Sequence, residues 1–307
     1  MGEKSEVDTT WLPSPARLND YQPGTVSSRV QVDLGALSHQ GKLRPNNEDH
    51  FLVARFDRTM CTLLTSLPAS DIPARYAETA YGMLVADGMG GAAAGEVASR
   101  TAIGALVDLV LQTPDWIMRF DEQTGKEVLR RMDQRFRQVR QALIERAESD
   151  PSLSGMGTTM TLACSLGTEL IIAHSGDSRA YLFRQGLLQP LTHDQTMAQW
   201  LADSGAIRPE EVATHPMRHV LTGAIATRGG KTPTELHHLR LTDGDQILLC
   251  TDGLAGMVTD SAIAAVLEAP RSAADTCRAL VDLALEGGGK DDVTVVLGRY
   301  RIPGLPE

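Results

Sequence analysis

Apolar residues follow two patterns along this chain: short unbroken runs, which indicate buried strands, and steps of three and four residues, which indicate helices. The runs predict strands at 30–37, 50–54, 83–86, 158–165, 170–174, 179–183, 235–239, 246–250 and 293–298. The helical spacing predicts helices from near Gly95 onward and over about 126–148, 195–204, 260–268 and 272–286. Strands and paired helices come in blocks rather than in strict alternation. This order favours an α+β fold in which helices cover antiparallel sheets.

Several segments lack either pattern. Residues 1–28 are polar and contain three prolines, and we expect a disordered tail. Residues 57–80 carry Pro68 and Pro73 and are expected to form an irregular surface loop with a short helix. The short turns at 167–168 and 176–177 predict antiparallel pairing of the strands on either side of each.

Composition narrows the class of protein. The 307 residues, 42% of them hydrophobic, suffice for one large domain at 29–302. The net charge of -10 argues against nucleic-acid binding, which needs a basic face. No apolar stretch could span a membrane and no signal peptide is evident, so we expect a soluble, cytoplasmic protein with no membrane partner. Nothing demands more than a monomer. The four cysteines are too scattered to predict a disulfide framework or a thiolate zinc site.

One short pattern occurs twice and suggests chemistry. Apolar runs end in Asp87-Gly88 and in Asp252-Gly253, and each is expected to break its strand there. Further acidic pairs stand at Glu48-Asp49 and Asp291-Asp292. Carboxylates gathered from distant segments repel one another unless a cation lies between them. The pattern therefore predicts a hard divalent metal site and a metal-dependent enzyme.

Six motifs follow one another in a defined order: RPNNED at 44–49, DGMGG at 87–91, GTT at 157–159, GDSR at 176–179, CTDGL at 250–254 and GKDDVT at 289–294. In order and spacing they resemble the PPM (PP2C-like) metal-dependent serine/threonine phosphatases of bacterial type. The resemblance covers residues 30–300 and is specific because six motifs agree. It implies a four-layer α-β-β-α sandwich, two antiparallel sheets flanked by helix pairs, with the metal site at one end. It also implies that residues 192–228 form a flap beside that site.

The resemblance assigns the site residues. Asp87 matches a carboxylate that bridges two metal ions, and the carbonyl of Gly88 a further ligand. Asp252 and Asp291 match carboxylates on the other ion, while Glu48 and Asp49 match residues that hold metal-bound waters. Asp177 matches a ligand of a third, weaker ion. Oxygen ligands suit Mn²⁺ or Mg²⁺ equally well.

Arg44 matches the arginine that holds the substrate phosphate, and its forked guanidinium suits two phosphate oxygens. Structural interpretations stay open beside these roles. Arg44 could form a surface ion pair and Asp177 a simple hairpin turn. We expect Arg179 to orient backbone or carboxylates rather than substrate, and Thr158 and Thr159 to pack within a strand.

The chain also departs from the family. Animal-type members carry a histidine directly after the first Asp-Gly, where this chain has Met89, and many bacterial members carry one after the following glycine pair, where it has Ala92. Water held by the metals is then the default proton donor, with His193 and His215 as alternatives. Asp292 stands where an asparagine is usual. In the flap, residues 223–226 read GAIA in place of an arginine and a Leu-Gly pair.

The resemblance implies hydrolysis of phosphoserine and phosphothreonine in proteins by a water that two metal ions activate. The partners would be phosphorylated proteins and a serine/threonine kinase that the enzyme opposes. Two alternatives remain open: a regulatory phosphoprotein-binding module with a decayed site, and a phosphatase of small phosphate esters.

Overall fold

The computed structural model describes residues 26–68, 70–90, 94–112, 122–228 and 234–303. Most of the predicted tail and Ala92 lie outside these ranges, but the short helix α1 shows that regular structure begins before residue 28. The helices are α1 Val26–Arg29, α2 Ala94–Leu111, α3 Glu122–Ser149, α4 Met197–Asp203, α5 Asp252–Ala255, α6 Asp260–Glu268 and α7 Ala273–Glu286, with 3₁₀ turns at Pro151–Leu153 and Pro209–Thr214. The strands are β1 Gln31–His39, β2 Asp49–Cys61, β3 Arg75–Met89, β4 Gly157–Thr158, β5 Met160–Leu166, β6 Glu169–Ser175, β7 Arg179–Arg184, β8 Leu187–Pro190, β9 Ile225–Ala226, β10 Glu235–Arg240, β11 Gln246–Cys250 and β12 Val293–Arg301.

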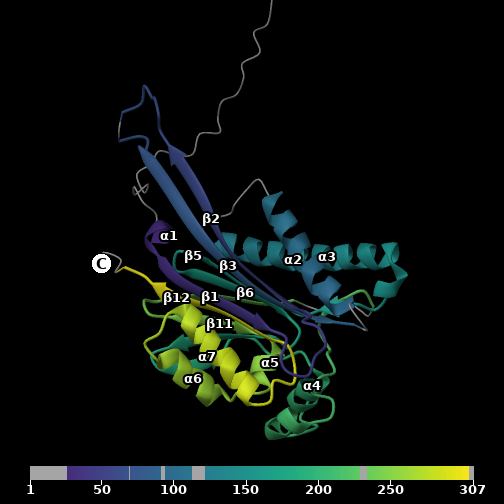
Figure 1. Ribbon diagram of the computed structural model, residues 1–307. Coiled ribbons are helices and arrows are strands. Elements are labelled where there is room, and N and C mark those ends of the chain that lie inside the picture. The colour runs from purple at the N-terminus through teal and green to yellow at the C-terminus, as the bar shows by residue number, and fades with distance from the viewer. Residues whose placement is uncertain (1–25, 69, 91–93, 113–121, 229–233, 304–307) are drawn as a thin grey trace, which may run out of the picture.

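Two antiparallel sheets form the centre of the molecule. One has the order β1-β12-β11-β7-β8, and the other has the order β10-β6-β5-β3-β4-β9 with β2 paired to β3. Figure 1 shows α2 and α3 on the outer side of one sheet and α5, α6 and α7 on the outer side of the other. The predicted four-layer arrangement is confirmed.

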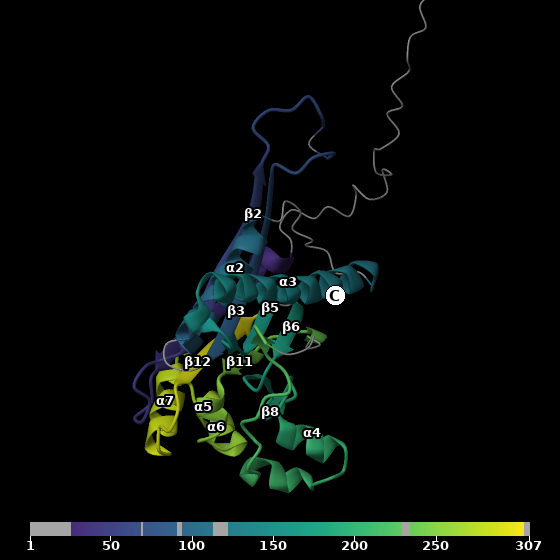
Figure 2. The same ribbon diagram turned by 90° about the vertical axis from the view of Figure 1, so that its right-hand side faces the viewer.

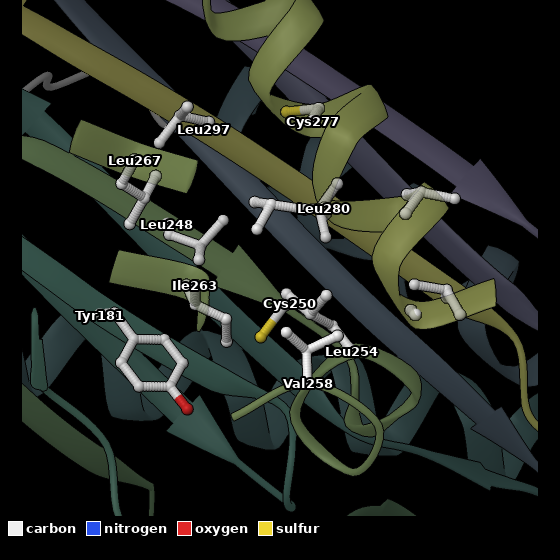
Figure 3. Close-up of a cluster of buried hydrophobic side chains, with 14 of the residues drawn as sticks. Tyr181, Leu248, Cys250, Leu254, Val258, Ile263, Leu267, Cys277, Leu280 and Leu297 are labelled. Atoms are coloured by element: carbon white, nitrogen blue, oxygen red, sulfur yellow. The ribbon is translucent and has the colours of Figure 1, made fainter. Parts of the chain in front are cut away.

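Three hydrophobic clusters fill the spaces between the four layers. One lies between α5–α7 and the first sheet, where Leu248 and Leu280 meet (Figure 3). A second lies under α2 and α3, and the third joins the facing sides of the two sheets. Burial at this scale is the main stabilising contribution to a domain of this size. The clusters therefore fix the strand ends from which the acidic residues project.

The hairpin β2–β3 corrects the expectation of an irregular loop at 57–80. Thirteen residue pairs, from Asp49↔Asp87 to Cys61↔Arg75, form a continuous ladder, and its far end projects beyond the body of the molecule (Figure 2). Cross-strand contacts hold this end: the Thr79 hydroxyl donates to the Asp57 carboxylate (2.9 Å), and Arg58 lies 5.8 Å from the Tyr76 ring centre. The two prolines lie in the connecting loop, where they do not interrupt the ladder. No helix is found at 57–80 within the part of that segment that the structure describes.

A second correction concerns the strands around residue 176. β5 and β6 pair as predicted, but β6 pairs with β10 on its other side, whereas β7 pairs with β11 and β8 in the opposite sheet. The short turn at 176–178 therefore crosses from one sheet to the other instead of closing a hairpin. It carries Asp177 to the edge where both sheets end.

Candidate metal centre

A cavity of about 750 Å³ opens at one end of the two sheets. Every predicted site residue except Asp49 lines it. These lining residues are Arg44, Glu48, Asp87, Gly88, Asp177, Asp252 and Asp291. They come from the loop before β2, from β3, from the turn between the sheets, from the start of α5 and from the loop before β12. The structure thus brings together carboxylates that are more than 200 residues apart in the sequence.

The main chain of Asp87 is hydrogen-bonded within the sheet. The Asp87 N–H donates to the Thr159 hydroxyl (3.0 Å), and the Asp87 carbonyl accepts from the Thr159 N–H (2.9 Å) and from the Thr158 hydroxyl (2.8 Å). The two threonines are buried, as expected of strand-packing residues, and they also position Asp87. β3 continues to Met89, so the expectation that Asp87-Gly88 ends its strand is wrong.

Gly88 lies against the first turn of α2. A methyl group in place of its hydrogen would overlap the carbonyl oxygen of Gly95 and would come within 2.7 Å of the carbonyl oxygen of Glu48. The Gly88 N–H donates to that same Glu48 carbonyl (3.2 Å). Only glycine allows strand, helix and loop to approach this closely, and the approach leaves Gly88 at the cavity wall.

Asp252 begins the short helix α5, as the second Asp-Gly prediction requires, since β11 ends at Cys250. The preceding Thr251 donates its hydroxyl to the Asp49 carboxylate (2.8 Å). Asp49 is buried, directly opposite Asp87 in the β2–β3 ladder. It therefore connects the two Asp-Gly segments from beneath the cavity.

The carboxylates of this cluster are placed at an electrostatic cost. Burial and nearby carboxylates raise the pKa of Asp49 to about 8 and that of Asp177 to about 7. The same causes raise the pKa of Asp87 well above its ordinary value. In addition, one buried carboxylate oxygen each of Asp49, Asp252 and Asp292 has no hydrogen-bond partner among the described residues.

A divalent cation would relieve both costs, because it supplies charge to the carboxylates and ligation to oxygens without a partner. The donor set contains only oxygen, which fits Mn²⁺ or Mg²⁺ rather than zinc. Among the described residues no three Asp, Glu, His or Cys side chains surround one point as ready ligands. The Asp291 carboxylate instead contacts the Arg44 guanidinium at 2.5 Å. The cavity residues therefore fit a divalent metal ion. Asp291 belongs to the acidic cluster and is also paired with Arg44.

Arg44 thus forms an ion pair, and its role toward a substrate phosphate stays a prediction. Its side chain is 49% exposed and its partner Asp291 lines the cavity with it, so the pair lies in the site and not on an unrelated surface. Arg179 behaves as predicted: its guanidinium donates to both carboxylate oxygens of Asp194, at 2.8 and 2.7 Å.

The sequence analysis missed two cavity residues in or next to the flap. His219 lines the cavity with its Nδ1 3.7 Å from an Asp252 carboxylate oxygen, and this contact raises the pKa of His219. His193 instead contacts Asp203 (2.8 Å), and neither it nor His215 is among the cavity-lining residues that the structure describes. The second missed residue is Arg228. No sequence signal separates His219 from the other flap histidines, since only folding brings it to Asp252.

Comparison with known proteins agrees with this geometry. The family model described as Protein phosphatase 2C matches residues 71–284. This chain belongs to the protein phosphatase 2C family. It is 40% identical over 215 residues to the serine/threonine protein phosphatase PstP of Mycobacterium tuberculosis, which covers 70% of this chain and 39% of PstP. It is 33% identical over 215 residues to the serine/threonine phosphatase stp of Listeria welshimeri, covering 70% of this chain and 82% of that protein.

Solved structures of the family are similar to most of this chain. The catalytic domain of PstP in complex with two manganese ions has a TM-score of 0.69 and 34% identity, and covers 89% of this chain and 99% of that one. The chain thus spans less than half the length of full PstP but nearly all of its catalytic domain. No helix among the described residues of this family member is long and apolar enough to cross a membrane.

Proposed function

We propose that this chain is a metal-dependent phosphatase that hydrolyses phosphoserine and phosphothreonine in proteins. The single observation that carries the proposal is the convergence of Asp87, Asp177, Asp252 and Asp291 on one cavity together with Arg44. This agrees with the names of the relatives and with the manganese ions of the PstP catalytic domain. The substrates would be phosphorylated proteins, and the chain would oppose a serine/threonine kinase as a cytoplasmic monomer.

Each residue has a distinct role in the proposal. Asp87 and the Gly88 carbonyl would hold metal from the β3 side, and Asp252 and Asp291 would hold it from the side of the opposite sheet. Asp177 would hold a third, weaker ion, and Glu48 would hold metal-bound water at the rim of the cluster. When bound, two divalent ions supply positive charge to the phosphoryl oxygens and lower the pKa of a water.

The protein residues orient the substrate and the cluster. Arg44 donates hydrogen bonds to the phosphate oxygens. Negative charge spreads over these oxygens in the transition state of phosphoryl transfer, so the planar guanidinium stabilises the transition state more than the bound substrate. Its pairing with Asp291 holds the guanidinium beside the cluster before substrate arrives. Asp49 receives the Thr251 hydroxyl and so fixes the start of α5 relative to β2.

The test uses the full chain with a phosphothreonine peptide. We expect turnover with Mn²⁺, loss of turnover with EDTA, and loss with Asp252→Ala. Asp282→Ala is the matched control, because Asp282 is exposed on α7 away from the cavity. Peptide binding without turnover would favour the regulatory module. Preference for phosphometabolites over the peptide would favour a phosphatase of small esters.

A further inference from the structure

Arg228 is attached to the same small sheet as the metal-site glycine. β4 pairs with β3 through Thr158↔Gly88, and β9 pairs with β4 through Ile225↔Thr158 and Gly157↔Ala226. Arg228 follows β9 by two residues. Its backbone is therefore displaced from Gly88 by three residue positions along the ribbon, at about 3.3 Å each, and by two strands across it, at about 4.8 Å each.

Local contacts hold the Arg228 side chain at the cavity. One terminal nitrogen donates to the Ser154 hydroxyl (2.8 Å), and the guanidinium carbon lies 3.8 Å from the position that a Cβ of Gly155 would take. The neighbouring Thr227 donates its N–H to the Met156 carbonyl (3.1 Å) and accepts from the Gly155 N–H (3.2 Å). The arginine is thus positioned although it is exposed. Most of its donors remain for another group.

The charge of Arg228 has no counterpart among the described residues. The other cavity arginine, Arg44, is paired with Asp291. Arg228 forms no ion pair with a carboxylate in the described part of the chain, where its hydrogen bond goes to neutral Ser154. A guanidinium that has no ion-pair partner can donate hydrogen bonds to an anionic group of a ligand.

In the flap, residue 223 is a glycine, and the side chain of Gln195 lies against it. At Gly223 a side chain would meet that of Gln195, whose Oε1 also accepts from the Gly176 N–H (3.1 Å). The Gln195 carbonyl accepts from the Thr222 N–H (2.8 Å). Gln195 therefore fills the space at 223 and ties the flap to the turn that carries Asp177, so a side chain at position 223 would require Gln195 to shift.

We propose that Arg228 binds a second anionic group of the substrate, up to about four residues from the phosphoresidue that is hydrolysed. This rests on the proposed function and adds a substrate class: phosphopeptides with a nearby carboxylate or second phosphate. Three residues along the ribbon and two strands across it amount to roughly 14 Å, and an extended peptide, which advances about 3.3–3.6 Å per residue, spans this with about four residues. A cavity of about 750 Å³ has room for such a segment.

The test compares phosphothreonine peptides that differ at one position, about two to four residues to either side of the phosphothreonine: Ala, Glu, phosphoserine or Lys. For the wild type we expect kcat/KM to be roughly three- to tenfold higher with Glu than with Ala at the favoured position. The Glu and phosphoserine peptides distinguish the two sources of negative charge. Lys should be the poorest substrate there.

Variants of Arg228 decide the proposal. In Arg228→Gln the ratio of kcat/KM between the Glu and Ala peptides should fall to about one, and Arg228→Glu should favour Lys over Glu. Arg228→Lys should keep part of the preference. Arg218→Gln is the matched control, because Arg218 is an exposed flap arginine outside the cavity lining, and it should keep the wild-type ratio.

Other outcomes overturn the inference separately from the function. A wild type that hydrolyses the Ala peptide but shows no preference refutes the role of Arg228 and leaves the phosphatase proposal standing. Equal losses of Arg228→Gln on all peptides and on p-nitrophenyl phosphate would place Arg228 on the hydrolysed phosphate instead. A wild type with no metal-dependent turnover of any peptide refutes the proposed function itself.

Discussion

The two Asp-Gly segments have the same sequence and opposite local structures. Asp87-Gly88 lies inside the long strand β3, with hydrogen bonds to its neighbours on both sides, whereas Asp252-Gly253 leaves β11 and begins α5. In both segments the glycine lies where another backbone comes too close for a side chain: that of Gly95 at Gly88 and that of Asp292 at Gly253. The same Asp-Gly pair therefore adopts a different backbone conformation at each of the two sites. What the segments share is a carboxylate next to a tight backbone contact at the cavity.

The first prediction tests whether Asp87, which lies in a strand, and Asp252, which begins a helix, contribute equally to catalysis. Asp87→Asn and Asp252→Asn should each lower kcat/KM on a phosphothreonine peptide by about a thousandfold or more, because each removes a proposed ligand of the divalent ions. Steady-state kinetics with Mn²⁺ measure this, and Asp282→Asn serves as the control. Substantial activity in one variant alone would break the equivalence.

The second prediction concerns the two glycines. Gly88→Ala and Gly253→Ala should each lower the free energy of unfolding by about 3 kcal/mol, since the new methyl group would overlap main-chain atoms that cannot move independently. Urea denaturation measures the effect. The control is Gly104→Ala in α2, where nothing lies within 4 Å of the added Cβ, and which should stabilise by about 0.5–1 kcal/mol. If Gly88→Ala were neutral, the close approach of α2 to β3 would be wrong.

The third prediction uses Asp49, which lies opposite Asp87 and beside Asp252. Because burial raises its pKa to about 8 in the folded state, its stabilising contribution is complete at low pH and is lost as the pH rises from the unfolded pKa towards 8. In EDTA, we expect the free energy of unfolding to fall by about 2 kcal/mol from pH 6 to pH 8. Asp49→Asn should flatten this dependence, as urea titrations at both pH values would show. If the free energy of unfolding did not change between pH 6 and pH 8, Asp49 would be ionised in the folded state as well.

The smallest effect is expected at Asp292, whose side chain accepts from the Glu48 N–H (2.8 Å) and whose carbonyl packs against Gly253. Asp292→Asn keeps an acceptor for Glu48 and removes one negative charge near the cluster. The apparent Kd for Mn²⁺ should rise about threefold with little change in kcat. Activity measured over a range of Mn²⁺ concentrations tests this, and a loss of kcat instead would assign Asp292 a direct part in turnover.

Much of the fold follows from local patterns. The apolar runs located most of the long strands, and helical spacing located α2, α3, α6 and α7, because burial on one face leaves its period in the sequence. The outer part of the β2–β3 hairpin was missed. The last five residues of β2 are exposed, and on β3 the buried residue 78 is a glutamate, so no apolar face sets a period there. The crossing at 176–178 was also missed. A three-residue turn looks the same whether the next strand joins its own sheet or the opposite one.

The order of motifs along the sequence determined the family, the acidic residues of the centre and the preference for hard divalent ions. These depend on residue type and spacing, which the chain carries locally. Only the tertiary structure decided which charges meet: Arg44 with Asp291, Asp49 with Thr251, His219 with Asp252, and Arg228 with no carboxylate among the described residues. These contacts join residues of both sheets with one another and with the flap. These pairings depend on how the three hydrophobic clusters pack the four layers together, and no single stretch of the sequence encodes that packing.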